Sequence, residues 1–400
     1  MVASFRHPFL LLTLLGALAL STLCAPALHA QPIRTILPTE TDPAITNANN
    51  RHTVLPPQGA PRNELFVFFP GTSPAIPLAY TDILRTASEL GYHAISLMYP
   101  NTLSVNRYYC WLRLDLDCHE NVRREVMTGA DTSNLIDIPR TESIEHRLIK
   151  LLDYLHANYP SENWNQFFTS GTNLNFSAMA MGGHSQGAGY AGLFAKDHPL
   201  LRVLLIAGID WNTSIRNQAS PWQNPPHQTP IERFFGLIHR DDELVPFALA
   251  TNAWALYGFD IFAPPVDVET APGSPYAGTH ILASSLGAPI TNFHGAIVVD
   301  IDAPRDENNR SIYRPSWIYM LSGPTTLDPV RVTFSSALLP ELQAEAIPGY
   351  SYQLETTTNL TAWLPVGPPV SATTNPPLIF TLPATLPHAA FRLDGAFEGF

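Results

Sequence analysis

The sequence predicts an α/β protein, in which helices flank a mostly parallel sheet, followed by a small all-β domain at the C-terminal end. Two observations carry this prediction. Between Leu65 and about residue 257, short apolar runs alternate with helical patterns, as expected of right-handed βαβ units. After about Pro329, short segments of alternating polarity follow, separated by proline and glycine turns and without a helical stretch of comparable strength.

The first thirty residues have the pattern of a secretory signal peptide. Arg6 precedes an almost wholly apolar run over residues 9–23, and small residues follow at Ala25, Ala27 and Ala30. Cleavage after Ala27 or after Ala30 would fit this pattern. Because the apolar run is shorter than the roughly 20 residues that span a bilayer, we expect a removable leader and no stable membrane insertion. The mature protein is therefore expected to be secreted or periplasmic.

The core of the α/β domain is expected over residues 65–328, after an extended lead-in at 31–64 that is rich in Pro, Thr and Asn. The run Leu65–Phe69 is continuously apolar and ends at Pro70, as expected of a strand buried on both faces. Apolar spacing on one helical face over residues 143–159 predicts a helix that Pro160 stops. The other expected elements are helices at 80–90, 186–196 and 247–257, and strands at 93–98, 177–181, 201–207 and 234–238.

Residues 329–400 are expected to form a small all-β module. The alternating runs Val330–Phe334 and Tyr350–Leu354 predict two of its strands. The segments at 349–354 and 358–363 resemble a β-sandwich appendage found at the ends of secreted bacterial proteins, so we expect a β-sandwich here. Trp363 and the tyrosines could line a platform for carbohydrate, although aromatic side chains in an all-β module are more often part of the core. Contact with a surface or a polysaccharide is the role that this module suggests.

Two cysteines, Cys110 and Cys118, remain once the leader is removed. In an oxidising compartment, two cysteines this close in sequence are expected to form a local disulfide. A partial metal site with His119 is the alternative, but no further cysteine remains to complete a structural zinc shell. The segment 101–140 is long for a connection, so we expect it to cover part of an active site as a cap that the disulfide pins.

The charge and the composition exclude several classes of function. Lys and Arg number 22 against 34 Asp and Glu, and the formal charge of −12 opposes binding to a phosphate backbone. The chain is 45% hydrophobic, which is enough to bury a core and argues against disorder. The sequence shows no metal motif, nucleotide loop or cofactor fingerprint. We therefore expect no nucleic-acid partner, no metal and no cofactor.

The strongest functional signal is the segment Gly183-His184-Ser185-Gln186-Gly187, which lies between a predicted strand and a predicted helix. This is the G-x-S-x-G pattern of a nucleophile elbow, where glycines permit a sharp turn that lifts the serine hydroxyl above the sheet. A purely structural glycine-rich turn is the alternative. Because a serine hydroxyl is a weak nucleophile at neutral pH, Ser185 would need a base, and the base would need an orienting carboxylate.

This elbow, the segment F-F-P-G-T at 68–72, the cysteine pair and the segment N-F-H-G at 292–295 resemble exported bacterial members of the α/β-hydrolase superfamily. The resemblance covers about residues 65–324 and implies that acid and base follow the serine in the order Ser, acid, His. An acid followed three and four residues later by Val and Pro has the usual form of the acid loop in this superfamily. Asp242, ahead of Val245 and Pro246, fits that spacing.

Other candidates for the acid and the base remain open at this stage. Asp241 and Asp210 are the alternatives to Asp242 as the acid. For the base, we favour His294, which lies in a loop-like stretch, over His280, which begins an apolar run that looks like a strand. His184 inside the elbow is disfavoured, because neighbouring residues of the elbow point in different directions.

Acyl transfer also requires donors for the negatively charged oxygen of the tetrahedral intermediate. One donor is expected to be the backbone N–H of Gln186, directly after the nucleophile. The second is expected from the loop after the first predicted strand, where Thr72 or Gly71 would serve.

The sequence therefore predicts a secreted serine hydrolase with the triad Ser185, His294 and Asp242. The most specific prediction is a carboxylic ester hydrolase, esterase-like or lipase-like, that forms an acyl-enzyme on a small-molecule or polymeric ester. A serine peptidase of the same fold and a catalytically inactive binding or adhesive protein are the alternatives.

Overall fold

The computed structural model describes residues 33–322, apart from 59, 171, 213–216 and 272, together with strands and one turn of the C-terminal region. The predicted signal peptide, residues 1–30, lies outside the described residues. The same holds for the linkers between the C-terminal strands, including Trp363.

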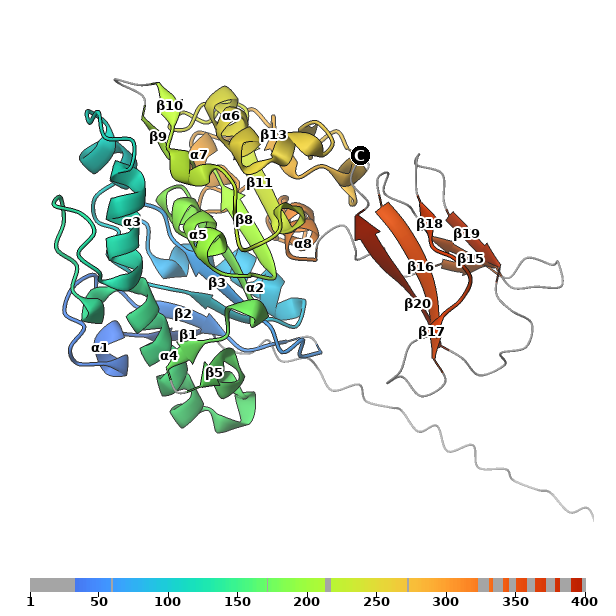
Figure 1. The fold of residues 1–400 in the computed structure, drawn as a ribbon, viewed down its shortest axis with the longest axis horizontal. Helices are drawn as coiled ribbons and strands as arrows, with labels where there is room; N and C mark the ends of the chain where they lie inside the picture. Colours follow the sequence, from blue (N-terminus) through green and yellow to red (C-terminus); the bar gives the residue numbers. More distant parts are fainter. Residues whose placement is uncertain are drawn as a thin grey trace, which may run out of the picture. The chain divides into compact units, whose positions relative to one another are not determined.

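A single sheet forms the centre of the described domain, with its strands in the order β1-β2-β4-β3-β7-β8-β11-β13-β12 (Figure 1). All pairs from β4 to β12 are parallel, whereas β2 runs antiparallel to both β1 and β4. The strands are β1 Arg34–Ile36, β2 His52–Leu55, β3 Leu65–Phe69, β4 His93–Ser96, β7 Met179–His184, β8 Arg202–Ile206, β11 Phe234–His239, β12 Val266–Asp267 and β13 Ile281–Ser284.

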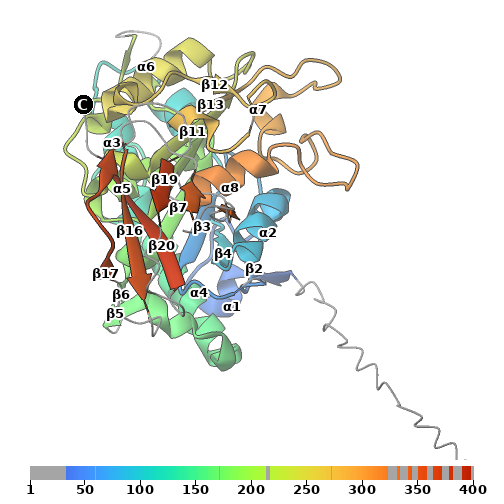
Figure 2. The same cartoon turned by 90° about the vertical axis from the view of Figure 1, so that its right-hand side faces the viewer.

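Helices cover both faces of this sheet, with α2 and α8 on one side and α3 and α5 on the other (Figure 2). Because neither face is open to solvent, the central strand β3 is apolar throughout, and all of its residues are buried. The helices are α1 Pro38–Thr41, α2 Thr81–Glu89, α3 Cys118–Thr128, α4 Ile144–Asn158, α5 Gln186–Asp197, α6 Phe247–Tyr257, α7 Phe293–Ala296 and α8 Arg314–Ser322.

Two short strand pairs and one π-helical turn lie outside the large sheet. β5, Phe168–Ser170, pairs with β6, Asn173–Leu174, and β9, Trp211–Asn212, pairs with β10, Gln218–Ala219. The π-helical turn η2, Val105–Cys110, ends at the first cysteine of the segment that the cysteines close.

The predicted α/β class is confirmed, and most predicted elements are present. The helix expected at 247–257 is α6, the helix expected at 143–159 is α4, and the strand expected at 65–69 is β3. The strand expected at 177–181 begins and ends later, as β7, because the short helical turn at 176–178 precedes it.

The segment 31–64 is more than the extended lead-in that its composition suggests. Its described part contributes β1 and β2 to the sheet edge, and all four residues of β2 are buried. The prediction missed these strands because both are short and β2 includes a histidine and a threonine. The sheet therefore begins before Leu65.

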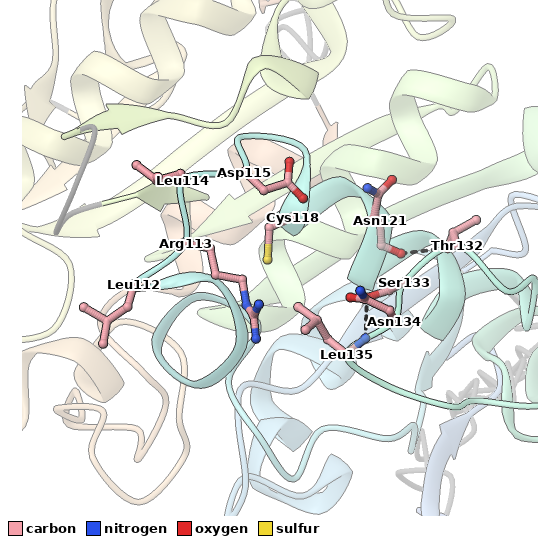
Figure 3. A pocket seen from close by; sticks show the side chains of 10 residues that line it. All are labelled: Leu112, Arg113, Leu114, Asp115, Cys118, Asn121, Thr132, Ser133, Asn134 and Leu135. Atoms are coloured by element: carbon pink, nitrogen blue, oxygen red, sulfur yellow. Dashed lines mark hydrogen bonds between the residues drawn. The ribbon is translucent and has the colours of Figure 1, made fainter.

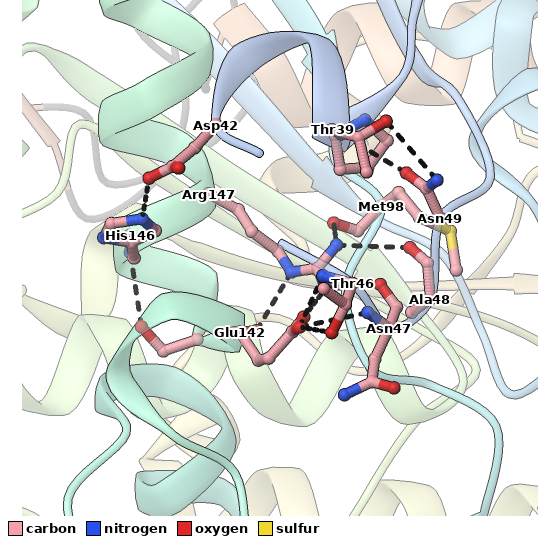
Figure 4. Close-up of polar contacts among 12 residues, drawn as sticks. Thr39, Asp42, Thr46, Asn47, Ala48, Asn49, Met98, Glu142, His146 and Arg147 are labelled. Atoms are coloured by element: carbon pink, nitrogen blue, oxygen red, sulfur yellow. Dashed lines mark hydrogen bonds and ion pairs between the residues drawn. The ribbon is translucent and has the colours of Figure 1, made fainter. Parts of the chain in front are cut away.

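A buried ion pair fastens this N-terminal segment to α4 (Figure 4). The Arg147 guanidinium contacts the Glu142 carboxylate and also donates to the carbonyl oxygens of Asn47 and Ala48, at 2.7 and 3.2 Å. Glu142 in turn accepts hydrogen bonds from the backbone and side chain of Thr46. Both charged side chains are almost fully buried, so each depends on the other for compensation of its charge.

All described elements after residue 330 are strands, as predicted for the C-terminal region. β14 Arg331–Thr333, β15 Glu341–Ala344 and β19 Leu378–Thr381 form one antiparallel set. The second set is built on β16 Tyr350–Thr357, which pairs with β17 Leu364–Pro365, β18 Val370–Ser371 and β20 Ala390–Phe397.

The described residues contain neither a membrane-spanning helix nor a metal-binding cluster. Within this part of the chain, no helix combines the length and the apolar composition needed to cross a membrane. The same residues contain no group of three or more His, Cys, Asp or Glu side chains arranged to hold a metal ion.

The Arg147–Glu142 pair is expected to contribute strongly to the stability of the fold. Arg147→Met should lower the free energy of unfolding by about 3 to 5 kcal/mol, because it leaves a buried carboxylate without its cation. Arg140→Met is the matched control, since Arg140 forms a more exposed pair with Glu145 and should cost only about 0 to 1 kcal/mol. Urea unfolding of both variants checks this, and equal losses would contradict it.

Candidate active site

Ser185 lies in the sharp turn between β7 and α5, as the G-x-S-x-G pattern predicts. Its φ of 54° and ψ of −119° are unusual for a residue with a side chain and mark a strained backbone. The surrounding structure holds this conformation, since the Ser185 amide donates to the Ile206 carbonyl of β8 at 2.8 Å. The side chain is half-buried and therefore remains accessible to a ligand.

The glycines at both ends of the elbow are required by close backbone contacts. A Cβ atom at Gly187 would lie 2.0 Å from the carbonyl oxygen of Phe69, at the end of β3. A Cβ atom at Gly183 would lie 2.2 Å from the carbonyl carbon of Gly187. Neither position admits a side chain, so the pattern G-x-S-x-G here reflects steric need and not only a turn preference.

Asp242 and His294 lie together although 52 positions separate them in the sequence. The His294 Nδ1 atom is 2.8 Å from Asp242 Oδ2 and 3.0 Å from Oδ1. The amides of Leu244 and Val245 donate to Asp242 Oδ1 at 2.9 and 2.7 Å, and they hold the carboxylate in place. Since this carboxylate accepts a hydrogen bond from Nδ1–H, Nε2 of a neutral His294 is left as the basic nitrogen.

The His294 ring lies beside the elbow. Its centroid is 4.7 Å from that of His184, the residue directly before Ser185. No hydrogen bond joins Ser185 Oγ to the His294 ring, although both residues belong to the described part of the chain. Catalytic hydrogen bonds are often long without a bound substrate, so this geometry is compatible with a nucleophile and its base.

The alternative acids and base are engaged elsewhere. Asp241 is exposed, and its amide donates to His239 Nδ1 at 3.0 Å. Asp210 forms a buried ion pair with Arg123 at 2.6 Å. Burial works against the charge of Asp210, but Arg123 outweighs it and holds the pKa of that carboxyl below its ordinary value.

His280 is a core histidine. Its ring centroid lies 3.5 Å from that of Phe262 and 4.4 Å from that of Phe235, and Nδ1 lies 2.6 Å from the Phe234 carbonyl oxygen. Burial lowers the pKa of His280 to about 3. A ring packed in this way is poorly placed to exchange protons with a ligand.

The loop 70–75 after β3 is held from several sides. The Tyr99 hydroxyl donates to the Pro70 carbonyl at 2.6 Å, and Asn101 Nδ2 donates to the Gly71 carbonyl at 2.7 Å. The Gly71 amide donates to the Tyr80 hydroxyl at 3.1 Å. Of the two candidate donors in this loop, the amide of Thr72 is therefore the one left unused by its described neighbours.

Gln186, which follows the nucleophile, begins α5, so its backbone N–H has no carbonyl partner within the helix. Its side-chain Oε1 accepts from the Val105 amide at 2.8 Å and from Thr72 Oγ1 at 3.4 Å. The two candidate oxyanion donors, Thr72 and Gln186, are thus joined by their side chains.

The predicted disulfide Cys110–Cys118 is confirmed. The turn η2, which leads into this disulfide, approaches the elbow, because the Val105 amide at its start donates to Gln186 Oε1. From α3, Arg123 Nη1 also donates to the Gln186 carbonyl at 2.9 Å. The segment 101–140 therefore lies next to the residue that follows Ser185, where a cap is expected.

A pocket of about 650 Å³ lies within the segment 101–140 and not at Ser185 (Figure 3). Its lining comes from the disulfide segment, from α3 and from the loop at 132–135. The Glu125 carboxylate supports that loop, since it accepts from the Ser133 and Ile138 amides at 2.9 and 3.0 Å.

Sequence reasoning missed three residues that shape the site: Tyr80, Asn101 and Arg123. Each is a buried polar side chain whose partner lies far away in the sequence, so the local pattern contained no signal for its contacts. Tyr80 and Asn101 hold the loop after β3, and Arg123 holds the start of α5.

The mostly parallel sheet with helices on both faces, together with the strand–Ser185–helix turn, defines an α/β-hydrolase fold. The chain matches no protein-family model and no curated protein sequence.

Solved structures with a similar fold include three that are named as hydrolases or esterases. An α/β serine hydrolase homologue from Coxiella burnetii is 12% identical, with 72% of this chain and 97% of that chain covered and a TM-score of 0.36. The esterase domain of a Rhodothermus marinus protein is 12% identical over 56% of this chain and 83% of that chain, with a TM-score of 0.31. An acetyl xylan esterase from Aspergillus awamori is 12% identical over 57% of this chain and 81% of that chain, with a TM-score of 0.33. At these values the similarity concerns the fold and carries no inference about activity.

The burial of His280 predicts a pH dependence of stability. An unfolded chain protonates this histidine below about pH 6.5, whereas the folded chain does so only near pH 3. The contribution of the neutral His280 to the free energy of unfolding is therefore fully present above pH 6.5 and is lost as the pH falls from 6.5 towards 3. His280→Asn removes the titration and retains an N–H donor for the Phe234 carbonyl.

Unfolding free energies of the wild type and His280→Asn should therefore diverge between pH 7 and pH 5. We expect the wild type to lose about 2 kcal/mol more than the variant over this range, from about 1.4 kcal/mol per pKa unit. Parallel curves for the two proteins would show that His280 is not held neutral in the folded state.

Proposed function

We propose that this protein is a serine hydrolase that cleaves carboxylic esters through a covalent acyl-enzyme. Ser185 is the nucleophile, His294 the general base and Asp242 the orienting acid. The observation that carries the proposal is the two-oxygen contact between Asp242 and His294 Nδ1, beside a serine in a strained elbow. A structural glycine-rich turn would not require a buried Asp–His pair next to it.

In the acylation step, Ser185 Oγ attacks the carbonyl carbon of the ester. His294 Nε2 accepts the hydroxyl proton as the bond forms, and Asp242 stabilises the resulting imidazolium through Nδ1–H. The tetrahedral intermediate then collapses, the bond to the alcohol oxygen breaks, and His294 returns its proton to the departing alcohol. The acyl group remains on Ser185.

Water completes the cycle by the same path. His294 Nε2 removes a proton from water as its oxygen attacks the acyl carbon, and the proton then returns to Ser185 Oγ as the carboxylic acid leaves. No external cofactor takes part in these steps.

The backbone amides of Thr72 and Gln186 are the proposed oxyanion donors. Support comes from the contacts around them: the neighbouring amide of Gly71 is used by Tyr80, and Gln186 is the first residue of α5. Donors that are fixed before the reaction stabilise the developing charge without reorganisation, which is commonly worth about 100-fold to 1,000-fold in rate for each donor.

The cap favours esters with an apolar acyl group. Tyr108, Leu112 and Leu114 are 65%, 73% and 62% exposed, which is unusual for three large hydrophobic residues so close in the sequence, within or just ahead of the disulfide loop 110–118. Since Gln186 binds Val105, ahead of these residues, we propose that this stretch borders the acyl-binding side of the site.

Export and the role of the C-terminal strands are further parts of the proposal. The signal-peptide pattern at residues 1–30 and the disulfide both favour an extracellular or periplasmic location. For the C-terminal module we propose contact with a surface or a polysaccharide, as its composition suggests, and no nucleic-acid partner.

Hydrolysis of a chromogenic ester series, from acetyl to palmitoyl, tests the mechanism. We expect turnover by the mature wild type and none by Ser185→Ala, because the variant lacks the attacking oxygen. Asp242→Asn should lower kcat about 10,000-fold, since an amide in place of the carboxylate no longer holds the imidazole in the tautomer that carries its proton on Nδ1. Asp241→Asn, at the exposed neighbouring residue, should retain wild-type turnover.

Two outcomes would count against this mechanism. Wild-type turnover by Ser185→Ala would exclude Ser185 as the nucleophile. Inactivity of the wild type towards all esters would exclude the ester specificity and direct attention to peptides or to a binding role.

Removal of the disulfide is expected to change both the stability of the protein and its acyl-chain preference. Cys110→Ser with Cys118→Ser should lower the free energy of unfolding by about 2 to 3 kcal/mol, because the short loop is no longer closed in the unfolded chain. It should also broaden the acyl-chain preference measured with the ester series, because the cap loses its anchor. Ser104→Ala, which removes only a local bond to the Arg107 amide, is the matched control and should change neither.

A further inference from the structure

His184, the residue before the nucleophile, has a hydrogen-bond partner at each ring nitrogen. Nδ1 lies 3.0 Å from the Tyr80 hydroxyl, and Nε2 lies 2.9 Å from the carbonyl oxygen of His294. The Tyr80 hydroxyl also accepts from the Gly71 amide at 3.1 Å. His184 and Tyr80 are both buried, so water does not compete for these bonds.

The donors and acceptors at its two ends determine the direction of this chain of hydrogen bonds. A carbonyl oxygen can only accept, so Nε2 of His184 must carry a proton and donate it to His294. In a neutral ring Nδ1 is then the acceptor, so the Tyr80 hydroxyl donates to it and uses a lone pair for the Gly71 amide. The sequence of donations is Gly71 to Tyr80, Tyr80 to His184, and His184 to His294.

Burial and the nearby His294 imidazole keep His184 neutral. Both lower the pKa of His184 well below its ordinary value, burial more strongly. A neutral ring with one donor and one acceptor satisfies the network completely, whereas a protonated ring would place a second N–H against Tyr80.

This chain of hydrogen bonds connects the two loops on which the proposed mechanism depends. One end is Gly71, whose neighbour Thr72 is a proposed oxyanion donor. The other end is the backbone of His294, the proposed base. Both loops are thereby tied to the last residue of β7, one position before Ser185.

We propose that Tyr80 and His184 are positioning residues, which hold the oxyanion loop and the base loop in register with Ser185 through one directed hydrogen-bond chain. This inference rests on the function proposed above. Neither side chain exchanges protons with the substrate. Their contribution is geometric: the Gly71 amide is kept occupied, so the Thr72 amide is presented to the site, and the His294 backbone is kept beside the elbow.

Three single variants separate the two ends of the chain. Tyr80→Phe removes the hydroxyl that serves both Gly71 and His184. His184→Asn keeps an acceptor near the Nδ1 position for Tyr80 but loses the donor to His294. His184→Gln keeps a donor near the Nε2 position for His294 but loses the acceptor for Tyr80.

Steady-state hydrolysis of a short soluble chromogenic ester is the readout. We expect each variant to lower kcat about tenfold to a hundredfold with KM changed less than threefold, because misplaced catalytic groups impair the transition state and not substrate binding. Tyr80→Phe should lower kcat less in the His184→Gln background than in the wild type, because the bond between the two residues is already lost there.

Tyr92→Phe is the matched control for loss of a buried tyrosine hydroxyl. Tyr92 donates to the Leu321 carbonyl at 2.8 Å and, within the described part of the chain, makes no hydrogen bond to the elbow, so its variant should lose thermal stability and retain kcat. The inference is overturned if Tyr80→Phe folds and keeps wild-type kcat, or if its loss of kcat matches that of Tyr92→Phe. Ester turnover that survives Ser185→Ala would overturn the proposed function and this inference together, whereas Ser185-dependent turnover with an active Tyr80→Phe overturns this inference alone.

Discussion

The close approach of α5 to the end of β3 is the constraint on which the rest of the site depends. Gly187 lies against the Phe69 carbonyl with no room for a Cβ atom, and Ser185 adopts a strained backbone as a result. The cost of that strain is met by the surrounding core, in which β3, β7 and β8 are almost wholly buried. A well-packed sheet is therefore a requirement for the elbow and not merely a support beneath it.

Polar contacts then fasten the loops around this turn. Asp242 reaches His294 from the end of β11, Arg123 reaches the first residue of α5 from the cap, and Asn101 reaches Gly71 from the segment after β4. Each bond is buried or nearly so, where an unmet donor or acceptor is costly. The loops are held less by their own local conformation than by these bonds to neighbouring loops.

The sequence predicted the parts of the molecule that local pattern determines. Apolar periodicity located α4, and the glycine pattern located the elbow, because helix faces and sharp turns have local requirements. It failed at β1 and β2, because both strands are short, and at the bond between Tyr80 and His184, because a partner 104 residues away leaves no local signal. Chain order and the spacing to Val245 and Pro246 favoured Asp242 as the partner of His294, whereas the exposure of Asp241 is visible only in the fold.

The N-terminal edge of the sheet has a consequence for the order of folding. β2 pairs with β4, and the carbonyls of Asn47 and Ala48 are bound by Arg147, about 100 residues later in the chain. In a chain synthesised from its N-terminus, this segment is present well before the residue that holds it. β2 can pair with β4 earlier, but the bonds from Arg147 that fasten the segment can form only after α4 has followed.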